Sequence, residues 1–179
     1  MRTEIVELTN LCMIKDGNKY LLQNRVKKDW QGYTFPGGHI EPGESIVHSV
    51  IREVKEETGL IVEDPRLVGV KQFWIESGRY IVFLFSATKF TGELRGSSEG
   101  EVGWYTKEEM KNMQLVNHFF EHLNIFEGDY SEYIYESEDS IKILEKKVIK
   151  KTSIYRVYFI NIKNNLKKGL QNMRIHCIL

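Results

Sequence analysis

The segment of residues 38–60 has the sequence GHIEPGESIVHSVIREVKEETGL and decides the fold. Residues 41–43, Glu-Pro-Gly, predict a turn, because proline fixes φ and glycine permits a positive φ. Ser45 then has the side chain of a helix N-cap residue, and Gly59 is a typical stop after the last helical turn. The segment therefore predicts a helix that begins after this turn, at Ser45, and runs to Thr58.

The predicted helix has two different faces. At about 100° per residue, one arc is apolar and is expected to face the core. Its members are Ile46, Val47, Val50, Ile51 and Val54. Glu53, Glu56 and Glu57 share a neighbouring arc, where like charges at this spacing repel one another by roughly 0.2–0.5 kcal/mol per exposed pair. Lys55 lies on another arc and does not neutralise them, so the pattern predicts either a solvated acidic surface or a site for Mg²⁺ or Mn²⁺, which prefer clustered oxygen ligands.

The spacing of the fixed residues in this segment resembles the complete Nudix box. The fixed positions are Gly38, Glu44, Arg52, Glu53, Glu56, Glu57 and Gly59, with the aliphatic residues Val54 and Leu60 at the two remaining positions. At typical residue frequencies such a match arises by chance with odds on the order of one in a million. From about residue 4 to residue 135 the chain is similar to bacterial MutT-like proteins of the Nudix superfamily, which are often described as 8-oxo-dGTP diphosphatases.

This resemblance implies an α+β fold of the α/β/α sandwich type, with a central mixed sheet between helices. It also implies hydrolysis of a nucleoside triphosphate, such as the oxidised purine nucleotide 8-oxo-dGTP, to a nucleoside monophosphate and pyrophosphate. The cofactor would be Mg²⁺ or Mn²⁺. By motif position the metal ligands would be Glu53, Glu56, Glu57 and the Gly38 carbonyl, with Glu44 and Arg52 in support. Arg52 is expected to pair with Glu44 or Glu53 and so hold that side chain in place. Two alternatives are open for the general base: Glu53, or one of Glu99 and Glu101 in the loop before Trp104.

Four further residues are candidates for substrate binding. By resemblance, Arg25 would bind a phosphate and Asn117 would bind a purine edge, whereas the alternatives are a surface arginine and a helix N-cap. Phe35 would stack on a base or pack in the core, and His39 would contact a phosphate. Aromatic residues that would line a base pocket or belong to the core are Trp30, Phe73, Trp74 and Tyr80.

The rest of the sequence predicts mostly strands. Apolar patterning indicates a hairpin from residues 5–14 and 20–23, strands at 65–75, 101–105 and 131–135, and a central strand at 80–87. A helical turn is expected at 107–113 and a helix at 117–126, with Phe119, Phe120, Leu123 and Phe126 on its apolar side. This order of elements is that of an α+β or mixed α/β protein.

Charge divides the chain into two predicted regions. The whole chain carries 25 basic and 25 acidic residues, but about ten Lys and Arg residues and one acid, Glu145, follow residue 140. We therefore expect a Nudix domain at residues 1–139, acidic by about nine charges, and a basic tail rich in Lys, Ile and Asn at 140–179. The acidic body argues against a surface that coats nucleic acid, except through the tail.

The same composition indicates a cytoplasmic protein. No apolar run approaches the roughly 18 residues of a membrane span, and the first residues lack a secretory signal. Cys12 and Cys177 are expected to be free thiols. The expected ligand is a small nucleotide, bound by a monomer or a homodimer.

Two other functions are compatible with the sequence. The same chemistry would act on another nucleoside diphosphate derivative, such as ADP-ribose, a dinucleotide polyphosphate or a capped RNA end. Alternatively, the chain would be a non-catalytic Nudix-fold binding module. The intact set of box glutamates favours an enzyme.

Overall fold

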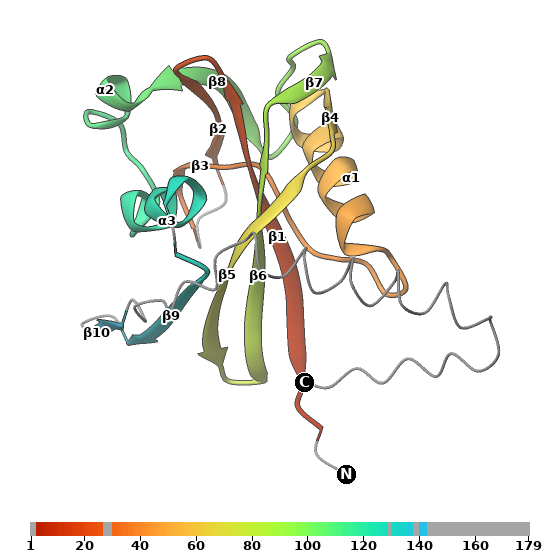
Figure 1. Ribbon diagram of the computed structural model, residues 1–179, viewed down its shortest axis with the longest axis vertical. Coiled ribbons are helices and arrows are strands. Elements are labelled where there is room, and N and C mark those ends of the chain that lie inside the picture. The colour runs from red at the N-terminus through yellow and green to blue at the C-terminus, as the bar shows by residue number, and fades with distance from the viewer. Residues whose placement is uncertain (1–2, 27–29, 129, 138–139, 143–179) are drawn as a thin grey trace, which may run out of the picture. The chain divides into compact units, whose positions relative to one another are not determined.

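The computed structural model describes residues 3–26, 30–128, 130–137 and 140–142 of the chain (Figure 1). The strands are β1 (Val6–Asp16), β2 (Lys19–Arg25), β3 (Gly32–Thr34), β4 (Leu60–Glu63), β5 (Arg66–Ile75), β6 (Gly78–Ala87), β7 (Lys89–Gly92), β8 (Gly100–Thr106), β9 (Glu132–Ser137) and β10 (Ser140–Lys142). The helices are α1 (Ile46–Thr58), α2 (Lys107–Met110) and α3 (Phe119–Glu127). Helix α1 is the longest of the three and coincides with the helix that the box predicts.

Eight of the strands form one mixed sheet. Their order is β10-β9-β5-β6-β1-β2-β3, and β8 pairs with β2 outside this path. β1 runs parallel to β6, with Val6 opposite Arg79 and Ile14 opposite Ala87, and β5 runs parallel to β9. The other pairs in this sheet are antiparallel. β6 lies between β5 and β1, so the prediction of a central strand there is confirmed.

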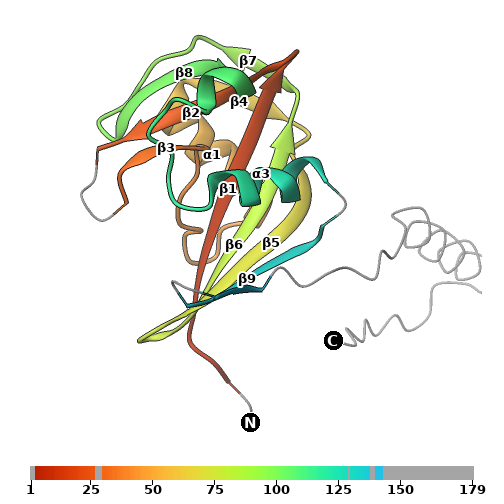
Figure 2. The ribbon, with the colours of Figure 1, turned by 90° about the vertical axis from the view of Figure 1, so that its left-hand side faces the viewer.

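Helices cover both faces of the sheet. Helix α1 packs on β1 and β4, and α3 packs on the opposite face against β5, β6 and β9 (Figures 1 and 2). Under α1, Val50 and Val54 are fully buried against Cys12, Ile14 and Phe85. Each such valine stabilises the fold by roughly 1.5–3 kcal/mol through burial. A second core lies under α3 and includes Phe35, Leu84, Phe119, Leu123 and Phe126. The predicted α+β sandwich with a central mixed sheet is thereby confirmed.

The structure differs from the sequence prediction in a few elements. β4 and β7 were not predicted; they are four-residue strands that pair with each other, with Leu60 opposite Gly92. Because each is short and its partner is distant in the chain, local patterning does not reveal them. Helix α3 begins at Phe119 rather than at residue 117, and Phe120, expected on its apolar side, is 40% exposed. Val47 on α1 is likewise 42% exposed, so the apolar arc of that helix is narrower than predicted.

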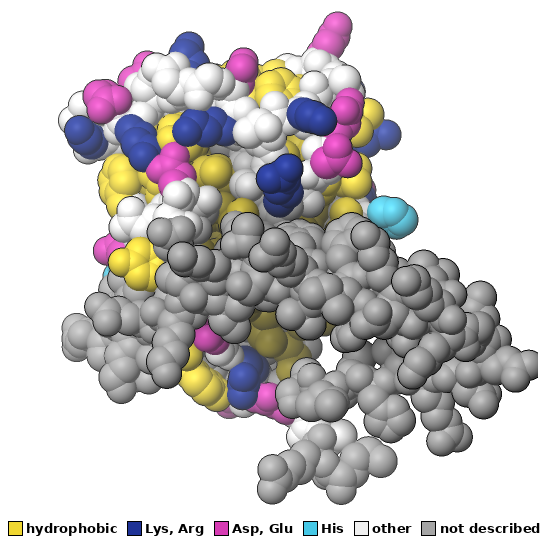
Figure 3. All heavy atoms as spheres, viewed as in Figure 1, with side chains coloured by type: hydrophobic (Ala, Val, Ile, Leu, Met, Phe, Trp, Pro, Cys, Tyr) yellow, Lys and Arg dark blue, Asp and Glu magenta, His cyan; other side chains and the backbone are white. Residues whose placement is uncertain are grey.

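The described residues also bear on the predicted tail and on the surface. β10, at the start of the predicted basic tail, pairs with β9, whereas residues 143–179 and with them Cys177 lie outside the described part. Cys12 is a buried free thiol. None of the helices in the described part is both long and apolar enough to cross a bilayer. On the face seen in Figure 3, which is viewed as in Figure 1, acidic and basic side chains of the described residues lie next to one another.

Candidate functional site

Helix α1 holds the acidic side chains in place through its two ends and its buried face. Ser45 is the N-cap residue, although its side chain makes no capping hydrogen bond, and Gly59 ends the helix in the left-handed conformation with φ 74°. A Cβ atom at Gly59 would also lie 2.4 Å from the Glu93 carbonyl oxygen, so this stop requires glycine. With Val50 and Val54 turned into the core, the glutamate arc of the helix faces the loop before it.

The loop that contains Pro36, Gly37 and Gly38 lies between β1 and this arc. The Cys12 and Asn10 N–H groups donate to the Pro36 and Gly38 carbonyls at 2.8 and 2.9 Å, which fixes the loop along β1. Gly37 has φ 151°, and a Cβ atom there would lie 2.2 Å from the Asn10 carbonyl oxygen. Its N–H donates to Glu57 Oε2 at 2.7 Å. The close approach that only glycine allows therefore positions a carboxylate of α1.

Arg52 connects the other acidic side chains of the box. Its guanidinium donates to both oxygens of Glu44, at 2.9 and 2.8 Å, and to the His39 carbonyl oxygen at 3.0 Å. It also donates to Glu53 at 2.8 Å and to Glu56 at 3.1 Å. The hydrogen bonds from Arg52 lower the pKa of Glu44 to about 2, so this carboxylate stays ionised. The sequence predicted pairing with Glu44 or Glu53, and the structure has both contacts.

Glu53, Glu57 and Glu99 place three carboxylates near one another, and Arg52 donates to Glu53 among them. Glu57 is 4% exposed, and burial raises its pKa to about 8, with further contributions from Glu53 and Glu99. Burial also raises the pKa of Glu53, and the Glu56 and Glu99 charges add to that effect. Uncompensated negative charge at a buried site disfavours the ionised form, unless a cation binds there.

We tested whether these residues fit a divalent metal ion. All of the donors are carboxylate or carbonyl oxygens, which is the chemistry that Mg²⁺ and Mn²⁺ prefer. A Cβ atom at Gly38 would lie 2.7 Å from the Glu53 carboxylate, so the absence of a side chain leaves that carboxylate accessible to the loop. Within the described residues no three Asp, Glu, His or Cys side chains are already arranged around one point, because Glu53 and Glu56 are turned toward Arg52. The donor set fits a metal ion, provided that these two side chains reorient.

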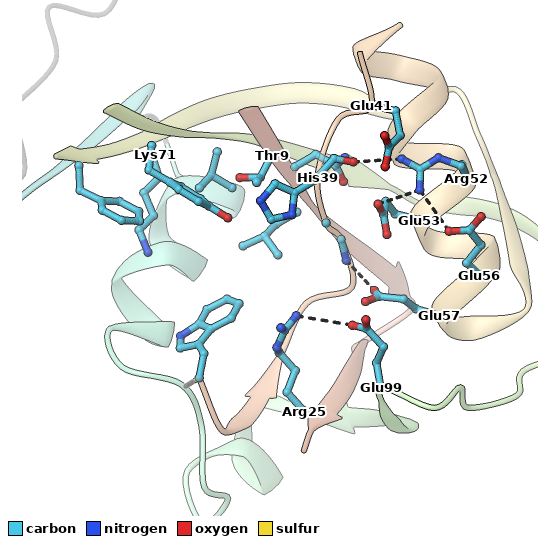
Figure 4. A pocket seen from close by; sticks show the side chains of 18 residues that line it. Thr9, Arg25, His39, Glu41, Arg52, Glu53, Glu56, Glu57, Lys71 and Glu99 are labelled. Atoms are coloured by element: carbon cyan, nitrogen blue, oxygen red, sulfur yellow. Dashed lines mark hydrogen bonds and ion pairs between the residues drawn. The ribbon is translucent and has the colours of Figure 1, made fainter. Parts of the chain in front are cut away.

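The loop before β8 supplies Glu99 to the same site. Glu99 Oε2 lies 3.9 Å from Arg25 Nη1, and both residues line the pocket (Figure 4). Arg25 also lies over the Trp30 ring, 5.1 Å from its centroid, and its Nε atom is buried without a hydrogen-bond partner. Glu101, the other candidate on this segment, is an exposed residue of β8 opposite Asn24 and does not line the pocket. The structure therefore brings Glu99, and not Glu101, next to the box.

Phe35 and Asn117 lie away from this pocket. Phe35 is 2% exposed and stacks on Phe119 at 5.0 Å between ring centroids, so its predicted contact with a base is wrong and the core alternative holds. Asn117 is exposed and does not line the pocket; the N-cap of α3 is His118, so Asn117 is not the N-cap either. The helix begins later than its apolar pattern predicts, which moves Asn117 into the preceding turn.

The pocket has a volume of about 820 Å³ and extends from the box to β5 and β6. His39 lines it, with its ring 3.7 Å from Glu7 Oε2. Of the aromatic candidates, Trp30, Phe73 and Tyr80 line the pocket, whereas Trp74 is 54% exposed outside it. The lining residues that the sequence did not suggest include Thr9, Asn10, Leu11, Glu41, Lys71 and Val82. For Asn10 and Lys71 the sequence did hold a signal, because each is a polar residue within a predicted strand.

Comparison with known proteins places this site in context. A sequence model of the NUDIX domain matches residues 8–126. The uncharacterized Nudix hydrolase YvcI of Bacillus subtilis is 36% identical over 120 residues, which cover 64% of this chain and 74% of the relative. The 8-oxo-dGDP phosphatase NUDT18 of Mus musculus is 29% identical over 60% of this chain, and the ADP-ribose pyrophosphatase of Methanocaldococcus jannaschii is 35% identical over 50%. The chain spans only 34% and 54% of the lengths of these two proteins.

A solved structure resembles the same region. The MutT protein from Bacillus halodurans superposes with a TM-score of 0.62 and 27% sequence identity, covering 75% of this chain and 94% of that protein. Two of the sequence relatives are thus named for different substrates, 8-oxo-dGDP and ADP-ribose, while the MutT protein shares the fold.

Proposed function

The chain belongs to the Nudix hydrolase family, and from this membership we propose that it hydrolyses a nucleoside triphosphate to a nucleoside monophosphate and pyrophosphate. An oxidised purine nucleotide such as 8-oxo-dGTP is the first candidate substrate. The observation that carries the proposal is the group of Glu53, Glu57 and Glu99, whose negative charge lies in the same pocket as Arg25. An anionic phosphate chain suits such a site when cations lie between the two sets of negative charge.

The box residues would hold those cations. We propose Glu53, Glu56, Glu57 and the Gly38 carbonyl as ligands of Mg²⁺ or Mn²⁺. A divalent ion supplies an activated water at neutral pH and stabilises the charge of the leaving group. Glu57 is oriented by the Gly37 N–H, and the Gly38 carbonyl retains a second lone pair beside its bond from Asn10. Arg52 would keep its bonds to Glu44 and to the His39 carbonyl while Glu53 and Glu56 turn from it toward the ion.

Residues around the box would bind the substrate and move the proton. Arg25 would bind a phosphate, since it lines the pocket beside Glu99 and its Nε atom has no hydrogen-bond partner. Its cation also orients Glu99 at 3.9 Å. The proposed general base is Glu53 or Glu99, because both line the pocket, whereas Glu101 does not. His39 is at the pocket wall, where its ring would contact the phosphate chain.

A panel of nucleotides tests the proposal. Purified protein would be incubated with Mg²⁺ or Mn²⁺ and with canonical and 8-oxo nucleoside triphosphates and diphosphates, while pyrophosphate and phosphate release are measured separately. ADP-ribose, dinucleotide polyphosphates and NAD-capped RNA belong in the same panel, because relatives are named for ADP-ribose and NAD-capped RNA. The relative kcat/KM values identify the substrate class. A triphosphate that yields pyrophosphate most efficiently supports the proposal, and turnover of none of the triphosphates would sink it.

The alternative of a non-catalytic binding module makes a different prediction. It expects nucleotide binding without turnover, and no effect of Glu57→Gln on any product. The proposed enzyme loses hydrolysis in this variant, because one oxygen ligand of the metal site becomes a neutral amide. Three glutamates of the box, Glu53, Glu56 and Glu57, line the pocket, which favours the enzyme.

A further inference from the structure

We propose that Lys71 determines which nucleobase the pocket accepts, by donating a hydrogen bond to an exocyclic carbonyl oxygen of the base. The inference rests on the proposed function, since it requires a nucleotide in the pocket of Figure 4. It concerns the end of the pocket away from the box, and it names the substrate class as keto purines rather than adenine.

Lys71 is held rigidly at this end of the pocket. It lies in the middle of β5, opposite Val82 of β6 on one side and Tyr133 of β9 on the other. A residue paired on both sides in a sheet has little backbone freedom, so the root of its side chain is fixed. Figure 4 shows the Lys71 side chain directed into the pocket from the side opposite Glu53, Glu56 and Glu57.

The ammonium group of Lys71 is available to a ligand. Among the described residues, two other basic side chains line the pocket, and both already face carboxylates: Arg52 contacts Glu44, Glu53 and Glu56, and Arg25 faces Glu99. Within the described part of the chain, Lys71 forms no ion pair with an acidic side chain. Burial alone lowers the pKa of its ammonium group to about 8, which agrees with the lack of a nearby carboxylate.

The surroundings of Lys71 suit a flat aromatic ring better than a phosphate. Its Nζ atom lies 5.4 Å from the centroid of the Phe73 ring, and Phe73 stacks on Tyr80 with 4.8 Å between centroids and 21° between planes. Trp30 lines the same pocket beside Arg25. Aromatic walls favour a stacked base, whereas the phosphate chain belongs at the box, where Arg25 and the metal ligands lie. The base then reaches toward Lys71.

The chemistry of an ammonium group selects between bases. It carries three hydrogen-bond donors and no acceptor, so it needs an acceptor on the ligand. The carbonyl oxygen at position 6 of guanine or hypoxanthine is such an acceptor, and so is the oxygen at position 8 of an oxidised purine. The amino group at position 6 of adenine is a donor, so adenine offers the ammonium no acceptor at that position. A hydrogen bond to a charged group in such a site corresponds to about tenfold to a hundredfold in affinity.

Two pairs of nucleotides isolate this contact. Inosine and adenosine monophosphates differ only at the position-6 edge, and 8-oxo-adenosine monophosphate adds only the oxygen at position 8 and its ring proton. Binding of all three to the full chain would be measured by calorimetry without added metal, so that the result does not depend on catalysis. The variants are Lys71→Met, which keeps the length and removes the charge, and Lys71→Arg, which keeps the charge. Lys89→Met, at an exposed lysine of β7 outside the pocket, is the matched control.

We expect the wild type to prefer at least one of the two carbonyl-bearing nucleotides over adenosine monophosphate. Lys71→Met should weaken the binding of that nucleotide by about tenfold or more, while the affinity for adenosine monophosphate should change by less than about threefold. Lys71→Arg should retain most of the preference, and Lys89→Met should match the wild type. Which nucleotide is affected tells whether the oxygen at position 6 or at position 8 is contacted.

The proposal is overturned if the wild type binds all three nucleotides with equal affinity. It is also overturned if Lys71→Met weakens the binding of all three equally or of none. An equal loss would assign Lys71 to the phosphate or the sugar. Failure of the proposed hydrolysis would appear differently, as an absence of turnover with the binding preference intact. Thermal unfolding of Lys71→Met, measured in parallel, establishes that the variant is folded.

Discussion

Replacing Glu57 by glutamine should abolish hydrolysis and at the same time stabilise the fold when no divalent metal is added. Burial raises the pKa of Glu57 from 4.5 to about 8, and Glu53 and Glu99 add like charge. An acid whose pKa is higher in the folded protein binds its proton more tightly there than in the unfolded chain. The stability that protonated Glu57 contributes to the fold is therefore fully present below pH 4.5 and is lost as the pH rises through about 8.

The size of the effect follows from this shift and from one hydrogen bond. Each unit of pKa difference corresponds to about 1.4 kcal/mol, so the charged form of Glu57 destabilises the fold by at most about 5 kcal/mol above pH 8. Glutamine removes the charge at nearly the same volume, and its amide oxygen still accepts from the Gly37 N–H. The hydrogen bond from the Gly37 N–H is weaker to a neutral amide than to a carboxylate, and this difference lowers the free energy of unfolding of the variant by about 1–2 kcal/mol. We expect a net stabilisation of about 3 kcal/mol, or a rise of about 6–12 °C in the unfolding temperature.

The measurement is thermal unfolding of wild type and variant with a chelator, at about pH 5 and about pH 9. The advantage of Glu57→Gln should be large at the higher pH and small at the lower. Glu56→Gln is the matched control: the same change one residue earlier, on a side chain that is 59% exposed, should alter stability by less than about 0.5 kcal/mol. Added Mg²⁺ should raise the unfolding temperature of the wild type more than that of Glu57→Gln. A variant that is no more stable than the wild type at about pH 9 would refute the assignment of a buried, uncompensated charge.

Three other predictions follow from particular contacts. Gly37→Ala should destabilise the fold by about 2 kcal/mol or more in urea unfolding, because its Cβ would lie 2.2 Å from the Asn10 oxygen, whereas Gly43→Ala meets no atom within 4 Å and should cost about 1 kcal/mol. Glu99→Gln should lower kcat by about a hundredfold and Glu101→Gln by less than about threefold; equal effects would contradict the placement of Glu99. Burial lowers the pKa of His122 to about 3, so stability is lost as pH falls from 6.5 toward 3, and His122→Leu should reduce that slope by up to about 1.4 kcal/mol per pH unit in urea titrations.

The sequence predicted those parts of the site that depend on local spacing. The ends of α1, the burial of Val50 and Val54 and the pairing of Arg52 with Glu44 all lie within one segment, where helix periodicity fixes which side chains meet. The turn before the helix and the glycine after it are also local signals. For such features the nearest neighbours in the chain are the nearest neighbours in space.

Features that depend on distant contacts were beyond the sequence. Phe35 lies directly before the loop of the site, but its ring stacks on Phe119, which is distant in the sequence. Glu99 and Glu101 differ by two positions on one segment, and only the start of β8 at Gly100, paired to Arg25, separates them. Lys71 lies within a predicted strand, but the partner strands that close the pocket around it come from elsewhere in the chain, so its place in the site could not be predicted.

Glu57 and Lys71 lie in the same pocket, on its opposite sides, and each has a pKa displaced toward its neutral form by burial. Neither shift improves the stability of the fold at neutral pH, so packing alone gives no reason for placing both charges there. A ligand that is anionic at one end, bridged by a metal ion, and bears a carbonyl oxygen at the other would satisfy both groups at once. Metal ion and base would then each compensate a different buried charge, and a nucleotide with its metal should stabilise the fold more than either does alone. The reaction would depend on α1, which packs on β1, while the choice of base would depend on β5, which β6 separates from β1 in the sheet.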